Sequence, residues 1–297
     1  METILSVQNL TKSYGKVRAL KGVSFEVPAG SVFGILGPNG SGKTTLLGII
    51  LNVLRSGSGS FTWFGRNAGT SGIRQQIGSL LETPNFYGYL SGTDNLRITQ
   101  AISGRGIPAD IDSVLRKVNL YERRWASFRS YSLGMKQRLA IAAALLGQPR
   151  VLVLDEPTNG LDPVGIAEIR GLIDELRQKG HTIIMASHLL DEVEKVCTHA
   201  AILKEGTLIT TGPVEEILRD DDIVEVSAAD LEKLAAVVGR LGRRIESVND
   251  VLLLYFPPGE ARLDKINRFC YENDIVLNRL VLKKKRLETR FFELTNN

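Results

Sequence analysis

Short, mostly apolar segments alternate with longer amphipathic segments along the first 220 residues of the chain. The segments Val32–Leu36, Val151–Leu154 and Thr182–Ala186 have the pattern of strands that are buried on both faces of a parallel sheet. Residues 43–54 and 163–179 have the length and spacing of helices. Because strand, turn and helix in this order form the unit of a parallel sheet, an α/β fold is predicted.

Two regions depart from this alternation. Residues 4–9 and 23–27 have strand patterns, and they predict an N-terminal antiparallel β subdomain. Residues 94–146 are mostly helical in pattern and lack strong strand signals. We therefore expect a helical subdomain over about 83–146, inserted before the strand at 151–154.

The pattern changes again near Gly212 and the acidic run Asp220–Asp222. From there the order strand, helix, strand, strand, helix, strand is predicted, at 223–227, 229–241, 244–248, 251–256, 261–273 and 275–283. This order suits a small ferredoxin-like α+β domain, and a further helix is predicted at about 287–294. The predicted domains are therefore 1–220 and 221–297, and the second contains no catalytic motif that we can identify.

Composition narrows the class of protein. The 297 residues are 43% hydrophobic and 24% charged, as expected for a globular protein with a sizeable core. The two cysteines, Cys197 and Cys270, are far apart in the sequence, so neither a disulfide framework nor a zinc site is expected. We expect the protein to reside in a reducing compartment. No signal peptide or membrane span is predicted. The basic run Lys283–Arg286 is interpreted as solvated surface, with a phospholipid or acidic partner as the alternative.

The segment Gly37–Thr44 matches a phosphate-binding loop (P-loop) at every fixed position, between a predicted strand and a predicted helix. Its glycines allow the backbone to wrap closely around phosphates, and the N-terminus of the following helix favours an anion. Lys43 is expected to bind the β- and γ-phosphates, Thr44 to ligate Mg²⁺, and Thr45 to reach the α-phosphate. The alternative is a glycine-rich turn without a ligand. The candidate phosphate-binding residues are Asn39, Gly40, Ser41, Gly42, Lys43, Thr44 and Thr45.

Two acidic residues follow the apolar segment at 151–154. Ligands of open α/β sheets bind at the carboxyl ends of the strands, which is where these residues are predicted to lie. Asp155 is expected to hold Mg²⁺ opposite Thr44, and Glu156 to accept a proton from an attacking water. The alternative is a turn with two solvated acids before Pro157.

Three further segments carry a resemblance to a known family. Tyr131–Arg138 resembles the signature segment of the ATP-binding-cassette (ABC) ATPases, Asn159–Pro163 resembles their D-loop, and Ser187-His188 resembles their switch histidine. The resemblance covers about residues 3–220 in the family's motif order. It implies an ATPase that uses ATP and Mg²⁺, works as a head-to-tail dimer, and drives a separate transmembrane permease subunit at the cytoplasmic face of the cell membrane.

The resemblance also implies roles for single residues. Ser132 and Gly134 would grip the γ-phosphate held by the opposite subunit, whereas by its position alone Ser132 would be a helix N-cap, and both can hold together. His188 would orient the water and Glu156, although a lone histidine here is more often structural. Tyr14 would stack on adenine, with a surface tyrosine as the alternative.

Some residues depart from the family pattern. Glu82 stands where the family has a glutamine near Mg²⁺, and we include it as a candidate metal ligand. Leu133 and Met135 stand where the signature has Gly and Gln. These departures resemble the bacitracin and lantibiotic self-protection exporters, which implies export of a peptide, lipid or drug-like molecule. An aromatic cluster at 86–90 is either a permease anchor or internal packing.

Two other functions remain open from the sequence. One is a soluble ABC ATPase that acts on ribosomes or DNA, although the single cassette and the ordinary interval between Lys43 and Asp155 argue against it and no nucleic-acid partner is expected. The other is a regulatory module that closes on ATP and hydrolyses it weakly. The presence of Asp155, Glu156 and His188 argues against this second alternative.

Overall fold

The chain folds into two compact units, Met1–Val214 and Glu215–Asn297. In the computed structural model the described residues are 2–67, 69–70, 72–81, 85–218, 222–239, 244–257 and 259–283. No helix within these ranges is both long and apolar enough to cross a lipid bilayer.

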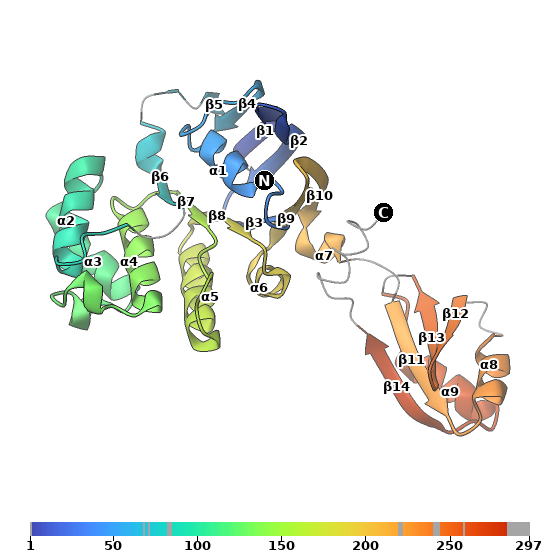
Figure 1. Ribbon diagram of the computed structural model, residues 1–297. Helices are drawn as coiled ribbons and strands as arrows, with labels where there is room; N and C mark the ends of the chain where they lie inside the picture. Colours follow the sequence, from blue (N-terminus) through green and yellow to red (C-terminus); the bar gives the residue numbers. More distant parts are fainter. Residues whose placement is uncertain are drawn as a thin grey trace. The chain divides into compact units, whose positions relative to one another are not determined.

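The first unit is built around a six-stranded sheet with the strand order β10-β9-β3-β8-β7-β6 (Figure 1). Neighbouring strands are parallel except for β9 and β10, which form an antiparallel hairpin. The strands predicted at 32–36, 151–154 and 182–186 are its central members, and the predicted α/β class is confirmed. The bounds are β3 Val32–Leu36, β6 Ile77–Leu80, β7 Val151–Asp155, β8 Thr182–Ser187, β9 His199–Lys204 and β10 Thr207–Pro213.

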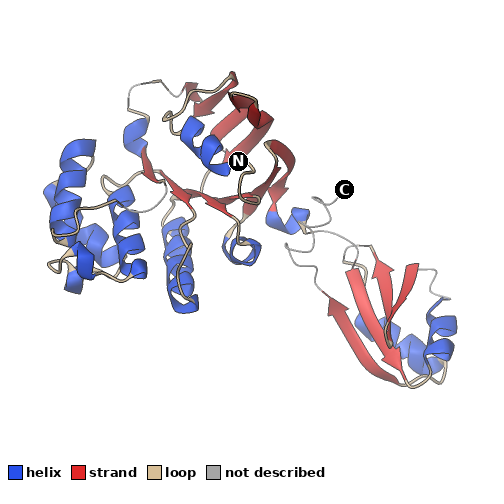
Figure 2. Ribbon diagram, in the orientation of Figure 1, coloured by secondary structure: helices blue, strands red, loops and turns tan. Residues whose placement is uncertain are grey.

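Helices cover both faces of this sheet (Figure 2). The helix predicted at 163–179 is confirmed as α5. The helix predicted at 43–54 ends earlier, at Ile50, because Asn52 has a left-handed backbone (φ 58°) and the N–H groups of Val53 and Leu54 turn back to donate to Gly48 O. The bounds are α1 Lys43–Ile50, α5 Pro163–Gln178 and α6 Leu190–Val196. A short helix, α7 Val214–Ile217, spans the boundary between the two units in the chain.

A second, antiparallel sheet has the order β2-β1-β4-β5, as the N-terminal prediction required. The strands predicted at 4–9 and 23–27 extend into one long hairpin that turns at Gly15. The bounds are β1 Thr3–Tyr14, β2 Val17–Pro28, β4 Ser58–Trp63 and β5 Arg66–Asn67.

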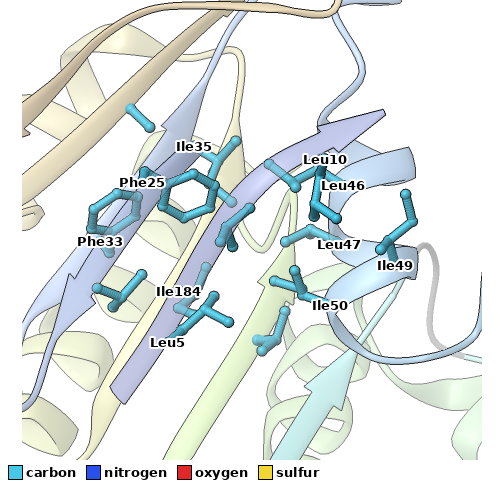
Figure 3. Packing of buried hydrophobic residues seen from close by; sticks show 14 of the residues in the cluster. Leu5, Leu10, Phe25, Phe33, Ile35, Leu46, Leu47, Ile49, Ile50 and Ile184 are labelled. Carbon is cyan, nitrogen blue, oxygen red and sulfur yellow. The ribbon is translucent and has the colours of Figure 1, made fainter. Parts of the chain in front are cut away.

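The main core lies where α1 packs between the two sheets (Figure 3). Leu46 and Ile49 of α1 pack there with Leu10 of β1 and Ile184 of β8, and none of these four side chains is exposed. Burial of one such side chain is worth about 1.5–3 kcal/mol, so this packing holds the start of α1 firmly against the end of β3.

The predicted helical subdomain follows β6 in the chain. Its helices α2, α3 and α4 follow one another in the chain (Figure 1), and the 3-10 helices η2 and η3 lie between α3 and α4. Ser91 caps the first helix by accepting from Asp94 N, and Ser132 caps the third by accepting from Met135 N. The bounds are α2 Gly92–Ser103, α3 Pro108–Lys117 and α4 Leu133–Leu145, with η2 Tyr121–Arg123 and η3 Phe128–Ser130. A further 3-10 helix, η1 Arg74–Gln76, precedes β6.

The second unit has a four-stranded antiparallel sheet in the order β12-β13-β11-β14, with two helices packed on its apolar residues. This order and the βαββαβ sequence of elements confirm the predicted ferredoxin-like fold. The helix predicted at about 287–294 lies outside the described residues. The bounds are β11 Asp222–Ala228, α8 Leu231–Val238, β12 Arg244–Val248, β13 Val251–Phe256, α9 Leu263–Glu272 and β14 Leu277–Lys283.

Candidate nucleotide site

The loop between β3 and α1 has a shape that depends on glycine. A Cβ at Gly37 would lie 2.4 Å from Leu203 O, and a Cβ at Gly42 would lie 2.5 Å from Ala19 O. Gly40 and Gly42 also have left-handed backbones, with φ of 81° and 104°. Side chains at these positions would therefore clash or strain the loop that leads into α1.

Lys43 lies beneath this loop with only 6% of its side chain exposed. Its Nζ donates to Gly37 O at 2.8 Å and to Pro38 O at 3.3 Å, and lies 3.7 Å from Glu156 Oε1. A buried ammonium group held at a helix N-terminus is suited to anionic oxygens.

Oxygen ligands for phosphate and metal lie beside Lys43, and of these Ser41 and Asp155 are buried. Thr44 Oγ1 donates to Asp155 Oδ2 at 3.0 Å, so the two predicted Mg²⁺ ligands are in contact. Ser41 Oγ is buried and, among the described residues, has no hydrogen-bond partner. This donor set fits a phosphate with a hard cation such as Mg²⁺. Glu82, the other predicted ligand, lies outside the described residues.

Glu156 and His188 meet at the carboxyl ends of β7 and β8. The Glu156 backbone is left-handed (φ 48°), an arrangement that costs about 1–3 kcal/mol, and its N–H donates to Ala186 O at 3.0 Å. One carboxylate oxygen, Oε2, lies 2.8 Å from His188 Nδ1. The other, Oε1, faces Lys43. The carboxylate is thus held between the predicted switch histidine and the predicted phosphate-binding lysine.

Lys43, Thr44, Asp155 and Glu156 line a cavity of about 980 Å³, whereas Ser41 and His188 are not among its lining residues. Tyr14 stands at its wall, 48% exposed, with Lys12 Nζ 5.2 Å from its ring centroid. Nine lining residues were not among the predicted site residues. They come from the β1–β2 hairpin, the first turns of α4, the segment between β7 and α5, and the β9–β10 turn. They are Lys16, Val17, Arg18, Ala19, Lys21, Leu133, Gln137, Asn159 and Glu205.

Ser132 and Gly134 do not line this cavity. They border a second hollow of about 300 Å³ with residues of the D-loop and α5, including Asp162 and Glu168, and Leu133 lines both this hollow and the cavity. Ser132 Oγ accepts from Met135 N at 3.2 Å, so the N-cap alternative is confirmed. A Cβ at Gly134 would have only one neighbour, Leu161 Cδ2 at 3.9 Å, which leaves open space at the helix N-terminus.

The fold and the cavity define a P-loop ATPase with an inserted helical subdomain and an appended ferredoxin-like unit. Residues 20–159 match the ABC transporter family model. The chain belongs to the ABC transporter family, as an ATP-binding subunit that hydrolyses ATP.

Among curated relatives, the bacitracin transport ATP-binding protein BcrA of Enterococcus faecalis is 34% identical over 99% of this chain and 97% of its own length. BcrA of Bacillus licheniformis is 36% identical over 99% of this chain and 98% of its own length. The lantibiotic transport ATP-binding protein SrtF of Streptococcus pyogenes is 41% identical over 69% of this chain and 89% of its own length. The predicted resemblance to this group is confirmed.

Solved structures give the same result for the fold. An ATP-binding cassette of an ABC transporter in its ADP conformation superposes with a TM-score of 0.67 and 27% identity, over 73% of this chain and 93% of its own. A dimeric ATP-binding cassette in a post-hydrolysis state with ADP and phosphate superposes with a TM-score of 0.63 and 25% identity, over 71% of this chain and 99% of its own.

Proposed function

We propose that this chain powers the export of a peptide, lipid or drug-like molecule through a separate transmembrane permease subunit. The observation that carries this proposal is the match to the two bacitracin transport proteins, which spans nearly the whole chain and includes the ferredoxin-like unit. The proposed arrangement is an ATPase domain at 1–220 and an accessory domain at 221–297. The chain would work at the cytoplasmic face of the membrane, bound to its permease.

Within the cavity we assign Glu156 as the general base, positioned by His188 on one oxygen and by Lys43 on the other side. Lys43, the backbone of Asn39 and Gly40, and the Ser41, Thr44 and Thr45 side chains would hold the phosphates. Thr44 and Asp155, with Glu82, would hold Mg²⁺, which when bound neutralises phosphate charge. Positioning and charge neutralisation supply most of the catalysis in such sites.

The separation of Ser132 and Gly134 from the P-loop cavity supports a head-to-tail dimer. In one chain these residues form an exposed helix N-terminus next to open space. Such an N-terminus favours a γ-phosphate, and a second copy would supply one. We therefore propose that each ATP is held by Lys43 of one copy and by Gly134 of the other.

The aromatic cluster at 86–90 has one half-buried part, which fits internal packing, and one exposed part, which fits a permease anchor. Phe86 packs against Phe128 at a centroid distance of 5.2 Å, which is internal packing. Tyr87 and Tyr89 are 52% and 76% exposed, and their rings lie 6.0 Å apart. We assign this exposed pair as the anchor for the permease, since aromatic side chains are typical of interface hot spots.

The test is affinity purification of the chain from gently solubilised membranes of its native host, with mass spectrometry of its companions. A stoichiometric multi-span membrane protein is expected, and substitution of Tyr87 and Tyr89 by serine should reduce its recovery. Recovery with ribosomes, nucleic acid or no membrane protein would contradict the transport proposal and leave the ATPase assignment intact.

A further inference from the structure

We infer that Arg105 is a positioning residue for ATP hydrolysis, because it ties β6, the strand paired with the Asp155 strand, to α4, the helix that Ser132 caps. Arg105 lies in the turn between α2 and α3, and in the sequence it is distant from both β6 and the end of α4. Its Nη1 donates to Ile77 O at 2.8 Å, at the start of β6. The guanidinium also reaches the end of α4, with Nη1 3.5 Å from Ala144 O and Nη2 3.3 Å from Ala143 O.

The chemistry at the end of α4 explains why an arginine stands there. The last carbonyl groups of a helix lack intrahelical donors and carry the negative end of the helix dipole. Helix α4, which the structure describes throughout, has no basic residue in its last turn. Arg105 supplies the missing cation from another segment, and its rigid planar fork presents separate N–H groups to carbonyls of two elements. Burial lowers the pKa of Arg105 from its ordinary value.

Glycines bring the three segments into direct backbone contact at this joint. A Cβ at Gly78 of β6 would lie 2.0 Å from Ala144 O. A Cβ at Gly106 would lie 2.8 Å from Gly147 N, just beyond α4. Gly106 also has a left-handed backbone, with φ of 75°. The joint therefore has little freedom to shift while the Arg105 hydrogen bonds are in place.

The two elements that Arg105 joins both lead to proposed parts of the site. Strand β6 pairs with β7, which ends at Asp155. Helix α4 begins at its N-cap Ser132. Arg105 itself does not line the nucleotide cavity. Its loss should therefore change the placement of catalytic groups and leave the P-loop contacts with ATP as they are.

The test compares R105M, R105K and the control R116M in the full chain. Arg116 is an exposed arginine of α3 in the same subdomain, stacked on Tyr121. The dissociation constant for ATP and the kcat for hydrolysis are measured well below the melting temperature. For R105M we expect kcat to fall about tenfold or more, because small misplacements at a reacting centre are costly, with an unchanged dissociation constant. R105K should be intermediate and R116M should match the parent chain.

Two results would overturn the inference. One is a kcat for R105M at the parent level with only a lower melting temperature, which would make Arg105 purely structural. The other is a loss of ATP affinity that parallels the loss of kcat, which would mean a general disturbance of the P-loop. If R105M fails to fold, R105K decides: reduced kcat at unchanged affinity supports the inference, and parent-level kcat contradicts it.

Discussion

The two units of this chain differ in how they use their residues. The first unit accepts backbone strain and buried charge where its proposed site lies, as at Glu156 (φ 48°) and at Lys43, which is 6% exposed. The second unit has its own apolar core and an antiparallel sheet. Its buried carboxylate, Glu225, is paired with Arg279 and Lys283. Left-handed residues and buried charge occur in both units, but in the first unit Lys43 and Glu156 line a cavity, whereas the ion pairs of Glu225 serve stability.

Among the substitutions that test this difference between the units, E156Q is expected to change ATP hydrolysis most. The substitution keeps the size of the side chain and removes the general base, which typically contributes 10²–10⁴-fold. We expect hydrolysis to fall by about 100-fold or more while ATP affinity is retained. Phosphate release and ATP titration measure the two quantities. E175Q, on the exposed face of α5 beside Lys179, is the control. Normal turnover in E156Q would show that another group is the base.

The next effect is expected from G134D. The open space at this position admits a side chain, and an acidic residue in the first turn of α4 favours the isolated helix. It would, however, repel a γ-phosphate from a second copy. We expect hydrolysis to fall by about tenfold or more, with single-chain ATP affinity and melting temperature maintained. A loss of melting temperature equal to that of a core variant would instead indicate a folding defect.

A smaller effect is expected from Y14A. Aromatic stacking contributes about 0.5–1.5 kcal/mol, so the KM for ATP should rise roughly fivefold with little change in kcat. Y14F and Y14W should restore the KM, because either ring can stack. An unchanged KM in Y14A would favour the surface-tyrosine alternative.

E225Q, in the second unit, is expected to leave ATP hydrolysis unchanged. A hydrogen bond from Lys283, with another from Arg279, holds the pKa of Glu225 below its ordinary value. A carboxylate with a depressed folded-state pKa stabilises the fold above the unfolded-state pKa, and this contribution is lost as the pH falls through the folded-state value. E225Q should therefore be less stable at neutral pH and lose part of the acid dependence, which urea unfolding from pH 7 to pH 3 would reveal. Equal acid dependence in both chains would contradict this assignment.

Local patterns in the sequence predict much of this molecule. The P-loop and the Asp155-Glu156 pair could be assigned because their chemistry depends on neighbours along the chain, and a run such as Val151–Leu154 shows a buried strand directly. The ferredoxin-like order followed from alternating short elements. These features need no knowledge of long-range contacts.

Features set by long-range contacts could not be predicted. Strand β6 is short and contains Gly78 and Ser79, so its apolar pattern is weak, and its place is fixed by pairing with β7 and by packing on α4. Lys16 and Glu205 reach the cavity only because distant turns fold over the P-loop. The hydrogen bonds of Arg105 likewise depend on three segments that meet in space.

A mixing experiment tests most directly whether two copies share each ATP site. Lys43 and Gly134 belong to separate hollows of one chain, so K43M and G134D each inactivate a different half of a shared site. Mixed dimers of the two variants contain one site with both halves intact. We predict that mixing the two variants raises ATP hydrolysis above the rate of either variant alone. Mixtures that form dimers but hydrolyse ATP no faster than the average of the two separate variants would contradict the head-to-tail arrangement.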